Sequence, residues 1–511
     1  MSATSHDRPT PAPAGERLST ATLRAVPAEL RPPVDRGALR PRVVHLGIGA
    51  FHRAHQAVYT EQAEVSAGGG WGIAGVTQRS GAVVAALRPQ DGLYSLTERR
   101  PEGPLTRVVG TVTEVLHAAD DGARLTGLLA SPDVTVVTLT VTEKGYRRDP
   151  ATGGLDLADP LIRGDLARSD LARGEVARGE VVRGGPARDG LAGVPAPATV
   201  VGQLAYGLRA RLRSGGAPLS VVSCDNMAGN GAVVRRLVRD FLSATGWSER
   251  ERLLEWTATS VAFPSTVVDR IVPATTEGDL RTAARALTLR DEGAVTAEPF
   301  TQWVLEDAFA ADRPRWEAGG ARFVADVAPY QLTKLRLLNG SHSLIAYLGL
   351  AAGCETVADV MATGWGEETV RAYCAEAAAS LPPADGLDIP GYVDSLVRRF
   401  ANPAMRHRIR QIAADGSLKI PERWLAPLRE LRATGHDTPR LTAALAAWAR
   451  ATRDTPAEDP AAEQLRRAWE RPAPDALRTL LLLLGAEDLA EDTALVTVVH
   501  RELNSPSAPP H

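Results

Sequence analysis

The hydrophobic and polar positions follow two different patterns, one before and one after about residue 328. Before it, short runs rich in β-branched residues alternate with segments of helical periodicity, which favours a parallel sheet covered by helices. The predicted strands are Val43–Leu46, Gly70–Thr77, Leu93–Arg99, Arg107–Leu116, Val134–Thr142, Leu219–Ser223, Phe300–Asp307 and Ala321–Val327. The helices predicted between them begin at about Phe51 and cover Gly122–Ala130, Pro197–Gly215 and Gly231–Thr245.

After it, helical periodicity continues without strand patterning. The first predicted helix, Pro329–Gly349, has a wide apolar face but also carries three polar residues, Lys334, Asn339 and His342. At about 100° per residue, His342 lies about 80° and Asn339 about 140° around the axis from Lys334, so all three can point into one cavity. The helices predicted next are Glu355–Met361, Glu367–Ser380, Tyr392–Phe400, Met405–Ala414, Pro421–Ala433, Arg440–Ala451, Ala461–Trp469, Pro474–Leu484 and Ala486–Glu502.

A lysine, an asparagine and a histidine in one cavity suit chemistry between an alcohol and a carbonyl group. A lysine whose ammonium form is disfavoured by burial can accept a proton near neutral pH. Asn and His can donate hydrogen bonds to an oxygen on which charge develops. The alternative is structural: Lys334 extends to the surface, Asn339 caps or bends the helix, and His342 is a core histidine. The helix alone leaves both interpretations open.

Composition and charge exclude several classes of protein. The 511 residues include 58 Lys and Arg against 61 Asp and Glu, and the formal net charge of −3 argues against a dedicated nucleic-acid or membrane-surface binder. No apolar run is long enough to span a bilayer, and the N-terminus lacks the apolar stretch of a secretory signal. The three scattered cysteines favour a reducing, cytoplasmic setting. Residues 1–17, rich in Pro and Ala, are predicted to be disordered.

The first predicted strand leads into a glycine-rich turn, Gly47-Ile48-Gly49, and then into a helix. This succession begins a dinucleotide-binding unit, in which the glycines let the backbone approach a pyrophosphate. The match is partial, because His52 stands at the third glycine position. His52 and His55 share one helical face, but no third metal ligand is evident. We therefore interpret them as part of a polar helix start beside a phosphate.

Residues after the next strands are candidates for ligand contacts, because the carboxyl ends of parallel strands face the ligand crevice. Arg79 follows the strand that ends at Thr77, at the place where an acidic residue would bind the ribose of NAD. Arg79 can meet a 2′-phosphate, stack on adenine or be a solvated surface residue, which leaves NAD and NADP open. Thr142 and Glu143, at the end of the strand Val134–Thr142, are candidates on the cofactor or substrate side.

Two further polar sites stand at the ends of apolar runs. Asn226 follows the strand Leu219–Ser223 and can hold a substrate hydroxyl or the nicotinamide side, or serve as a turn or helix-capping residue. Asp269 and Arg270 come out of the apolar run Thr259–Thr275, either as a structural ion pair or as part of the pocket. The sequence around each residue leaves its alternatives open.

Residues 164–193 form a five-residue repeat, LARSD-LARGE-VARGE-VVRGG-PARDG. A five-residue period matches neither helix nor strand, and the segment mixes opposite charges with many glycines. It is therefore predicted to be a solvated, mobile insertion. A nucleic-acid-binding arm is the alternative, but the interleaved Asp and Glu cancel most of the positive charge.

Six motifs stand in order along the chain: GIGAFHRAHQ, QDGLYSLTER, TVTEKGY, SVVSCDNMAGNG, PSTVVDRIVP and KLRLLNGSHS. In this order and spacing they closely resemble the mannitol dehydrogenase family of polyol-specific long-chain dehydrogenases. The resemblance covers about residues 18 to 500 and departs from the family at the repeat. It implies a Rossmann-type α/β dinucleotide-binding domain at 18–328, followed by a mostly α-helical substrate and catalytic domain at 329–505.

The resemblance also implies roles for individual residues. Lys334 is implied to be the general base in alcohol oxidation and the acid in ketone reduction. Asn339, His342 and Asn226 are implied to bind and polarise the reacting oxygen and its neighbours, and Asp269 to line the polyol site. The cofactor site is implied to include Gly47, Ile48, Gly49 and Phe51. The family works without a metal, favours NAD and often acts as a monomer, so a monomer or weak oligomer is expected.

The substrate implied by the resemblance is a polyol and its ketose, of the mannitol and fructose type. The alternative is a hexuronate reductase acting on fructuronate or tagaturonate, and a further one is a mannitol-1-phosphate 5-dehydrogenase. Arg410 is a candidate for binding an acidic end of the substrate. It belongs to a basic stretch that either faces solvent or binds such an end: Arg399, Arg406, Arg408, Arg410 and Lys419.

Two other classes of protein share some of these features. The spacing Tyr330-x-x-x-Lys334 is that of short-chain dehydrogenases, but those chains are about half as long and lack a following helical domain. A non-catalytic nucleotide-binding protein on the same scaffold is the other class, and the presence of Lys334, Asn339 and His342 together argues against it. The partners expected are small molecules, not nucleic acid or a membrane.

Overall fold

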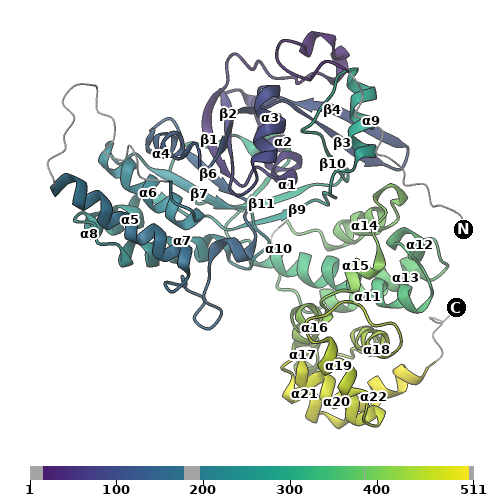
Figure 1. Ribbon diagram of the computed structural model, residues 1–511. Helices are drawn as coiled ribbons and strands as arrows, with labels where there is room; N and C mark the ends of the chain where they lie inside the picture. The colour runs from purple at the N-terminus through teal and green to yellow at the C-terminus, as the bar shows by residue number, and fades with distance from the viewer. Residues whose placement is uncertain (1–14, 178–195, 385, 506–511) are drawn as a thin grey trace, which may run out of the picture. The chain divides into compact units, whose positions relative to one another are not determined.

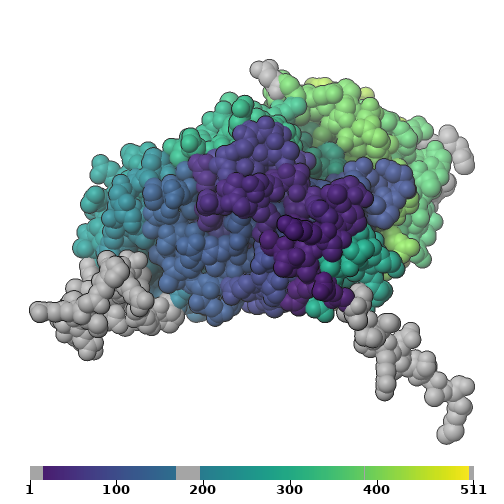
Figure 2. Space-filling view, turned by 90° about the horizontal axis from the view of Figure 1, so that it is seen from above, coloured from purple at the N-terminus to yellow at the C-terminus, as the bar shows by residue number. Residues whose placement is uncertain are grey.

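The computed structural model describes residues 15–177, 196–384 and 386–505. They belong to two compact units, one made of Met1–Arg99 and Gly103–Val327, and one made of Arg100–Glu102 and Ala328–His511. In the space-filling view, the first unit is the continuous body that runs from purple through blue to teal (Figure 2).

The first unit is built on a six-stranded parallel sheet (Figure 1). Its spatial order is β5 (Val112–His117), β2 (Trp71–Thr77), β1 (Arg40–Leu46), β6 (Val136–Leu139), β7 (Leu219–Ser223) and β8 (Val261–Ala262). Numbered along the chain, these strands lie in the order 3-2-1-4-5-6, which is that of dinucleotide-binding doubly wound sheets. The chain therefore reverses its direction of progress between β1 and β6.

Both faces of this sheet are buried, because its central strands are apolar at nearly every position. In β1, Val44 and Leu46 face a core that includes helices α4, α6 and α7, whereas Val43 faces a second core that includes α1 and α2. The helices of this unit are α1 (Ala50–Ala54), α2 (Gln56–Ala67), α3 (Gly81–Leu87), α4 (Gly122–Ala130), α5 (Pro160–Ala177), α6 (Val200–Arg213), α7 (Asn230–Ala244), α8 (Arg250–Ser260) and α9 (Glu277–Leu287).

Two small sheets complete the first unit. One has the order β10 (Val295–Ala297), β3 (Tyr94–Arg100), β4 (Gly103–Val109), and the other β12 (Arg322–Val324), β11 (Gln302–Glu306), β9 (Thr266–Asp269). The prediction of one strand over Arg107–Leu116 is wrong, because β4 and β5 belong to different sheets. The chain turns at Gly110, whose N–H donates to the buried Glu61 carboxylate at 2.6 Å.

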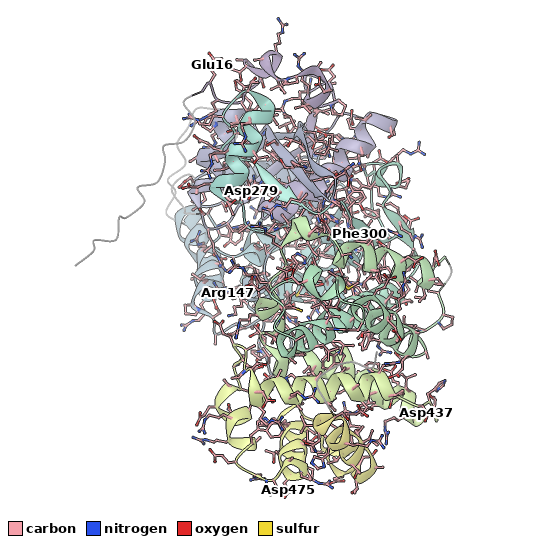
Figure 3. The ribbon with its side chains drawn as sticks, turned by 90° about the vertical axis from the view of Figure 1, so that its right-hand side faces the viewer. Glu16, Arg147, Asp279, Phe300, Asp437 and Asp475 are labelled. Atoms are coloured by element: carbon pink, nitrogen blue, oxygen red, sulfur yellow. The ribbon has the colours of Figure 1, made fainter. Side chains whose placement is uncertain are left out.

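The second unit is helical and packs around one apolar core (Figure 3). Its α-helices are α10 (Ala328–Thr333), α11 (Gly340–Ala351), α12 (Val357–Met361), α13 (Gly366–Ala378), α14 (Ile389–Phe400), α15 (Ile409–Ala413), α16 (Gly416–Ile420), α17 (Ala426–Ala433), α18 (Pro439–Asp454), α19 (Ala462–Ala468), α20 (Ala473–Leu483), α21 (Glu487–Glu491) and α22 (Thr493–Asn504). A π turn joins α10 to α11, and another joins α16 to α17. The predicted fold class, a Rossmann-type domain followed by a mostly α-helical one, is confirmed.

Three predicted segments need correction. The repeat at 164–193 is helical as far as Ala177, because α5 runs into it, and residues 178–195 lie outside the described residues. In the predicted disordered tail, Glu16 and Arg17 are ordered, since the Arg290 N–H donates to the Glu16 carbonyl at 2.8 Å. The helix predicted over Met405–Ala414 begins only at Ile409, because Arg406 adopts a left-handed backbone conformation with φ of 48°. Residues 1–14 lie outside the described residues.

Candidate active site

A cavity of about 460 Å³ lies in the first unit at the carboxyl ends of β1, β2 and β6. This is where the chain reverses between β1 and β6, the usual ligand position in open α/β sheets. Five of the predicted cofactor residues line it, namely Gly47, Ile48, Gly49, Arg79 and Thr142. Phe51 and Glu143 are not among its lining residues. The Phe51 ring stacks on His55 at 5.0 Å between centroids, and Glu143 is exposed at the start of a 3-10 turn.

The turn after β1 needs glycine at one of its two glycine positions. Gly47 has φ of +112°, and a Cβ there would lie 2.1 Å from the Thr140 carbonyl oxygen. The Gly47 carbonyl in turn accepts a hydrogen bond from the Thr140 hydroxyl at 2.8 Å. Gly49 has an ordinary φ of −82°, and a Cβ there would come no closer than 3.8 Å to Gly47. Gly47 therefore shapes the turn, whereas the absence of a side chain at Gly49 keeps the exposed turn backbone open.

His52 and His55 lie in the core, so the prediction that they form a polar helix start beside a phosphate is wrong. The His52 ring is fully buried and stacks on His45 of β1, with 3.4 Å between ring centroids. Burial lowers the pKa of His45 to about 3, although its contact with the Gly47 carbonyl opposes this shift, and both rings are held neutral. His55 donates from Nε2 to the Gln302 carbonyl at 2.9 Å. Stacked rings thus fill the helix–strand contact that a third glycine usually permits.

The side chains around this cavity carry positive charge, and no carboxylate is among its lining residues. Arg79 is exposed. Arg147, which is labelled in Figure 3, forms an ion pair of 3.1 Å with Asp159. Gln78 directly follows β2 and exchanges two side-chain hydrogen bonds with Gln203 of α6, at 3.0 and 2.9 Å. An anionic ligand would therefore meet cations and amides here.

The predicted catalytic helix contains a π turn that spans Lys334–Asn339. In a π turn an N–H bonds to the carbonyl five residues back, as Gly340 does to Leu335. Residues five apart then lie one above the other, as residues four apart do in an α-helix. Lys334 and Asn339 are five apart, so the calculated angle of about 140° does not hold and both side chains lie on one side of the helix. Both are half-buried.

The third polar residue of this helix, His342, is also half-buried. Its ring stacks on Phe400 of α14, with centroids 4.9 Å apart, and lies 5.9 Å from the ring of His407. The aromatic contact fixes the plane of the imidazole. His342 is therefore a ring held in a defined orientation near the surface of the helical core.

The remaining predicted residues are divided between the two units. In the first unit, Asn226 is exposed after β7 and Asp269 is buried at the end of β9. Arg270 is structural, since its buried guanidinium pairs with Glu98 at 2.9 Å and donates to a neighbouring carbonyl. In the second unit, Arg410 is exposed on α15. Sequence patterns gave no reason to separate Asp269 from Arg270.

Both units match known families. Residues 41–318 match the mannitol dehydrogenase Rossmann domain, and residues 326–505 match the mannitol dehydrogenase C-terminal domain. The chain belongs to the mannitol dehydrogenase family. The recognition made from the six motifs is thereby confirmed, and the chain is an oxidoreductase with a nicotinamide dinucleotide cofactor.

Relatives in this family resemble the chain over nearly its full length. D-mannonate oxidoreductase of Escherichia coli is 37% identical over 92% of this chain and 94% of its own. Mannitol 2-dehydrogenase of Pyrenophora tritici-repentis is 33% identical over 94% of this chain and 82% of its own. Among solved structures, Pseudomonas fluorescens mannitol 2-dehydrogenase with NAD and D-mannitol has a TM-score of 0.74 and 31% identity, covering 96% of both chains.

One functional candidate in this family member escaped the sequence reasoning. Asp225, next to Asn226, accepts a hydrogen bond from the buried Tyr146 hydroxyl at 2.6 Å. Burial raises the pKa of Asp225 to about 7, although hydrogen bonds from Tyr146 and Ser223 oppose this shift. The sequence offered one signal, the position of Asp225 at the carboxyl end of a strand, but it could not show the burial.

This pKa predicts a pH-dependent stability. The pKa of Asp225 is about 7 in the folded protein and about 3.9 in the unfolded chain. The stability contributed by its protonated form is therefore fully present below a pH of about 3.9. It is lost as the pH rises through about 7. A shift of this size corresponds to about 4 kcal/mol of unfolding free energy. Denaturant unfolding between pH 4 and 8 should therefore show a loss of stability that Asp225→Asn reduces. A smaller loss should remain, because burial also raises the pKa of Glu61 and Asp291. The exposed Asp312→Asn is the control, and equal slopes for wild type and Asp225→Asn would contradict the assignment.

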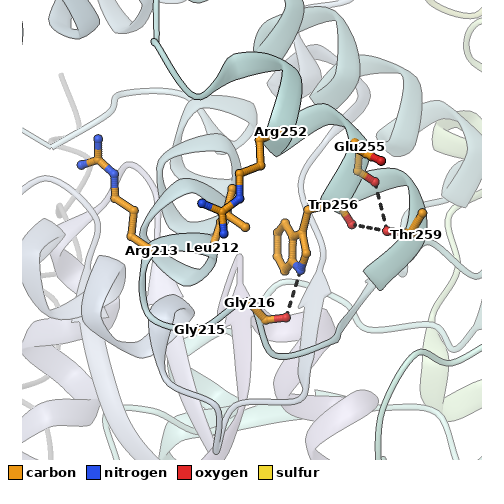
Figure 4. A pocket seen from close by; sticks show the side chains of 8 residues that line it. All are labelled: Leu212, Arg213, Gly215, Gly216, Arg252, Glu255, Trp256 and Thr259. Atoms are coloured by element: carbon orange, nitrogen blue, oxygen red, sulfur yellow. Dashed lines mark hydrogen bonds between the residues drawn. The ribbon is translucent and has the colours of Figure 1, made fainter.

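A second cavity of about 600 Å³ is a weaker candidate for this enzyme's active site, despite its larger volume (Figure 4). It lies between the end of α6 and α8, beside Gly215 and Gly216, which precede β7. It is thus at the amino end of a strand, opposite the usual ligand edge. Its indole N–H, from Trp256, is already donated to the Gly216 carbonyl at 2.9 Å.

Within residues 15–177, 196–384 and 386–505, there is no group of three or more His, Cys, Asp or Glu side chains that could hold a metal ion. In the same ranges, every helix is too short or too polar to cross a membrane.

Proposed function

We propose that this protein interconverts a secondary alcohol and a ketone on a sugar-derived chain, with Lys334 as the general acid and base. The observation that carries this proposal is the π turn, because it brings Lys334 and Asn339 to one side of a half-buried helix. A base and a hydrogen-bond donor side by side are what the alcohol oxygen requires. Membership of the mannitol dehydrogenase family supports the same reaction.

The cofactor cavity suits the phosphate part of a dinucleotide. Its volume of about 460 Å³ falls in the range of ligand sites, and the exposed Gly49 leaves room for a phosphate against the turn. Gly47, Ile48, Arg79 and Thr142 would hold the cofactor with it. When bound, the nicotinamide supplies or accepts the hydride.

The side chains of the chain itself handle the proton and the oxygen. In oxidation, Lys334 takes the hydroxyl proton, and in reduction it returns the proton to the carbonyl oxygen. Asn339 donates a hydrogen bond to that oxygen as its charge grows, and His342 donates to that oxygen or to a neighbouring hydroxyl. One such donor is worth roughly 3 to 4 kcal/mol in comparable sites. Asp269 accepts from a neighbouring hydroxyl of the substrate, which orients the sugar chain.

A sugar acid is the substrate class that the observations favour. The similarity to D-mannonate oxidoreductase extends over 92% of this chain and 94% of that relative. Arg406, Arg408 and Arg410 are exposed in one stretch before and along α15, and Arg410 is the candidate partner of the substrate carboxylate. A polyol and ketose pair of the mannitol and fructose type is the second candidate, supported by similarity to mannitol 2-dehydrogenases.

Either nucleotide fits the charges of the cavity. The exposed Arg79 and the absence of a carboxylate among the lining residues suit a 2′-phosphate, as in NADPH. The NAD bound in the Pseudomonas fluorescens relative supports NADH. We propose that the protein accepts both.

Initial rates of NADH and NADPH oxidation test the function. Purified protein is assayed with fructuronate, tagaturonate, fructose and fructose 6-phosphate. A rate confined to the uronates, and weakened in Arg410→Ala through a higher KM, is the expected result. A rate with fructose alone would replace the sugar acid by the polyol candidate, and a lack of turnover in every combination would contradict the proposed reaction. A matched control is Arg398→Ala, an exposed arginine on α14.

A further inference from the structure

Two π turns lie against each other in the second unit. One is Lys334–Asn339, and the other is Pro421–Leu425, between α16 and α17. A π turn widens the helix, disturbs the regular hydrogen-bond ladder and is rare, occurring frequently at functional sites. The contacts that hold each widened turn in place therefore bear on the candidate site as well as on the fold.

The second π turn supplies side-chain donors to the first. Arg423 donates from Nη1 to the Asn339 carbonyl at 3.3 Å and to the Ser343 hydroxyl at 2.7 Å. Trp424 donates from its indole N–H to the Gly340 carbonyl at 3.1 Å. Trp424 is fully buried. The two consecutive carbonyls at the junction of the π turn with α11 are thus both held from outside the helix.

A third donor comes from α13. The buried Tyr373 hydroxyl donates to the Arg336 carbonyl at 3.0 Å, inside the first π turn. A Cβ at Gly340 would lie 2.1 Å from this hydroxyl oxygen, so only glycine lets Tyr373 come so close. Packing therefore explains why position 340 is glycine. The backbone conformation of Gly340 is helical and would accept other residues.

We propose that Arg423, Trp424 and Tyr373 form a clamp that sets the position of Lys334 and Asn339 for the reaction. Their bonds go to backbone carbonyls of the turn and of its junction with α11, and Arg423 also donates to the Ser343 hydroxyl on α11. None of these bonds goes to the side chain of Lys334 or Asn339, so the three residues act through the helix as positioning residues. The clamp holds the wide turn, and the wide turn keeps Lys334 and Asn339 on one side of the helix. This inference rests on the proposed function of Lys334.

Arg423→Met tests the clamp, because it removes the donors while keeping much of the apolar length. Arg423→Lys keeps a donor at the same place. The matched control is Arg429→Met on α17, which removes an exposed ion pair with Asp488 of α21. Each variant is measured for melting temperature, kcat, KM for cofactor and substrate, the pH profile of kcat, and amide hydrogen exchange across residues 335–341.

We expect Arg423→Met to remain folded and to lose about 100-fold in kcat, since a misplacement of about 1 Å costs this much. The KM for cofactor should change little, the pH profile of kcat should shift because the lysine environment changes, and exchange should rise in 335–341. Arg423→Lys should restore most of the kcat and most of the protection from exchange in 335–341. Arg429→Met should match wild type in every measurement.

Two results would overturn the clamp: exchange in 335–341 that equals wild type, or faster exchange with kcat and pH profile unchanged. If Arg423→Met does not fold, Trp424→Phe removes a single N–H with less loss of packing and undergoes the same measurements. A wild-type protein without turnover on any substrate would instead contradict the proposed function, and hydrogen exchange would still test whether the clamp holds the turn.

Discussion

Replacing Lys334 with alanine should lower kcat by about 100- to 10,000-fold, the usual contribution of a general acid–base group. The residue is half-buried at the start of the π turn, and the apolar residues of the helix carry the packing of this unit. The melting temperature should therefore stay within a few degrees of wild type. Steady-state rates with the best substrate of the panel, measured beside thermal unfolding, check both parts.

Lys334→Arg separates charge from proton transfer. Arginine keeps the positive charge but stays protonated throughout the working pH range, so it cannot act as a base. Kcat should stay near that of the alanine variant, while the KM for substrate should stay nearer to wild type. Near-native turnover in either variant would refute the assignment of Lys334 as the acid and base.

Gly47→Ala should have the second large effect, on both folding and cofactor binding. The new Cβ would lie 2.1 Å from the Thr140 carbonyl, and φ of +112° disfavours any side chain. Backbone strain of this kind costs roughly 1–3 kcal/mol, and the steric overlap adds to it. Cofactor affinity should fall at least about tenfold, since each 1.4 kcal/mol is a factor of ten. Denaturant unfolding and NADH fluorescence titration measure the two losses.

Gly49→Ala is the matched control within the same turn. Its Cβ would meet only the Gly47 carbonyl, at 3.8 Å, so the unfolding free energy should be near wild type. Cofactor affinity should nevertheless fall, because the methyl group would occupy the open side of the turn. If the two variants unfold alike, the proposed difference between the glycines is wrong.

The sequence predicted the first unit well where each apolar run forms one strand of one sheet. β1, β2, β6 and β7 are apolar and bounded by turns, and their order along the chain was sufficient to place Gly47, Arg79 and Thr142 at one edge of a parallel sheet. The prediction of one strand over Arg107–Leu116 failed, because this apolar run contributes strands to two different sheets on either side of Gly110. A run of β-branched residues has the same appearance whether or not its strand partner changes midway.

The candidate site was less predictable, because two of its features arise from tertiary contacts. The π turn has no signature in the spacing of apolar residues, and α-helical geometry gave the wrong angle between Lys334 and Asn339. His52 was interpreted as polar surface, yet it is buried against His45, a partner that comes from a preceding strand. The geometry of the π turn is decided by contacts with residues far along the chain, and the burial of His52 by packing of its helix on the neighbouring strand.

The amide pair between Gln78 and Gln203 has a consequence for how cofactor preference can evolve. The two side chains satisfy each other, and Gln203 is buried on α6, 125 positions away in sequence. A carboxylate introduced at position 78 would still accept the hydrogen bond from the Gln203 amide N–H. The Gln203 side-chain oxygen, however, would lose its donor. Descendants that change their nucleotide should therefore alter both positions together, and the two should covary across the lineage.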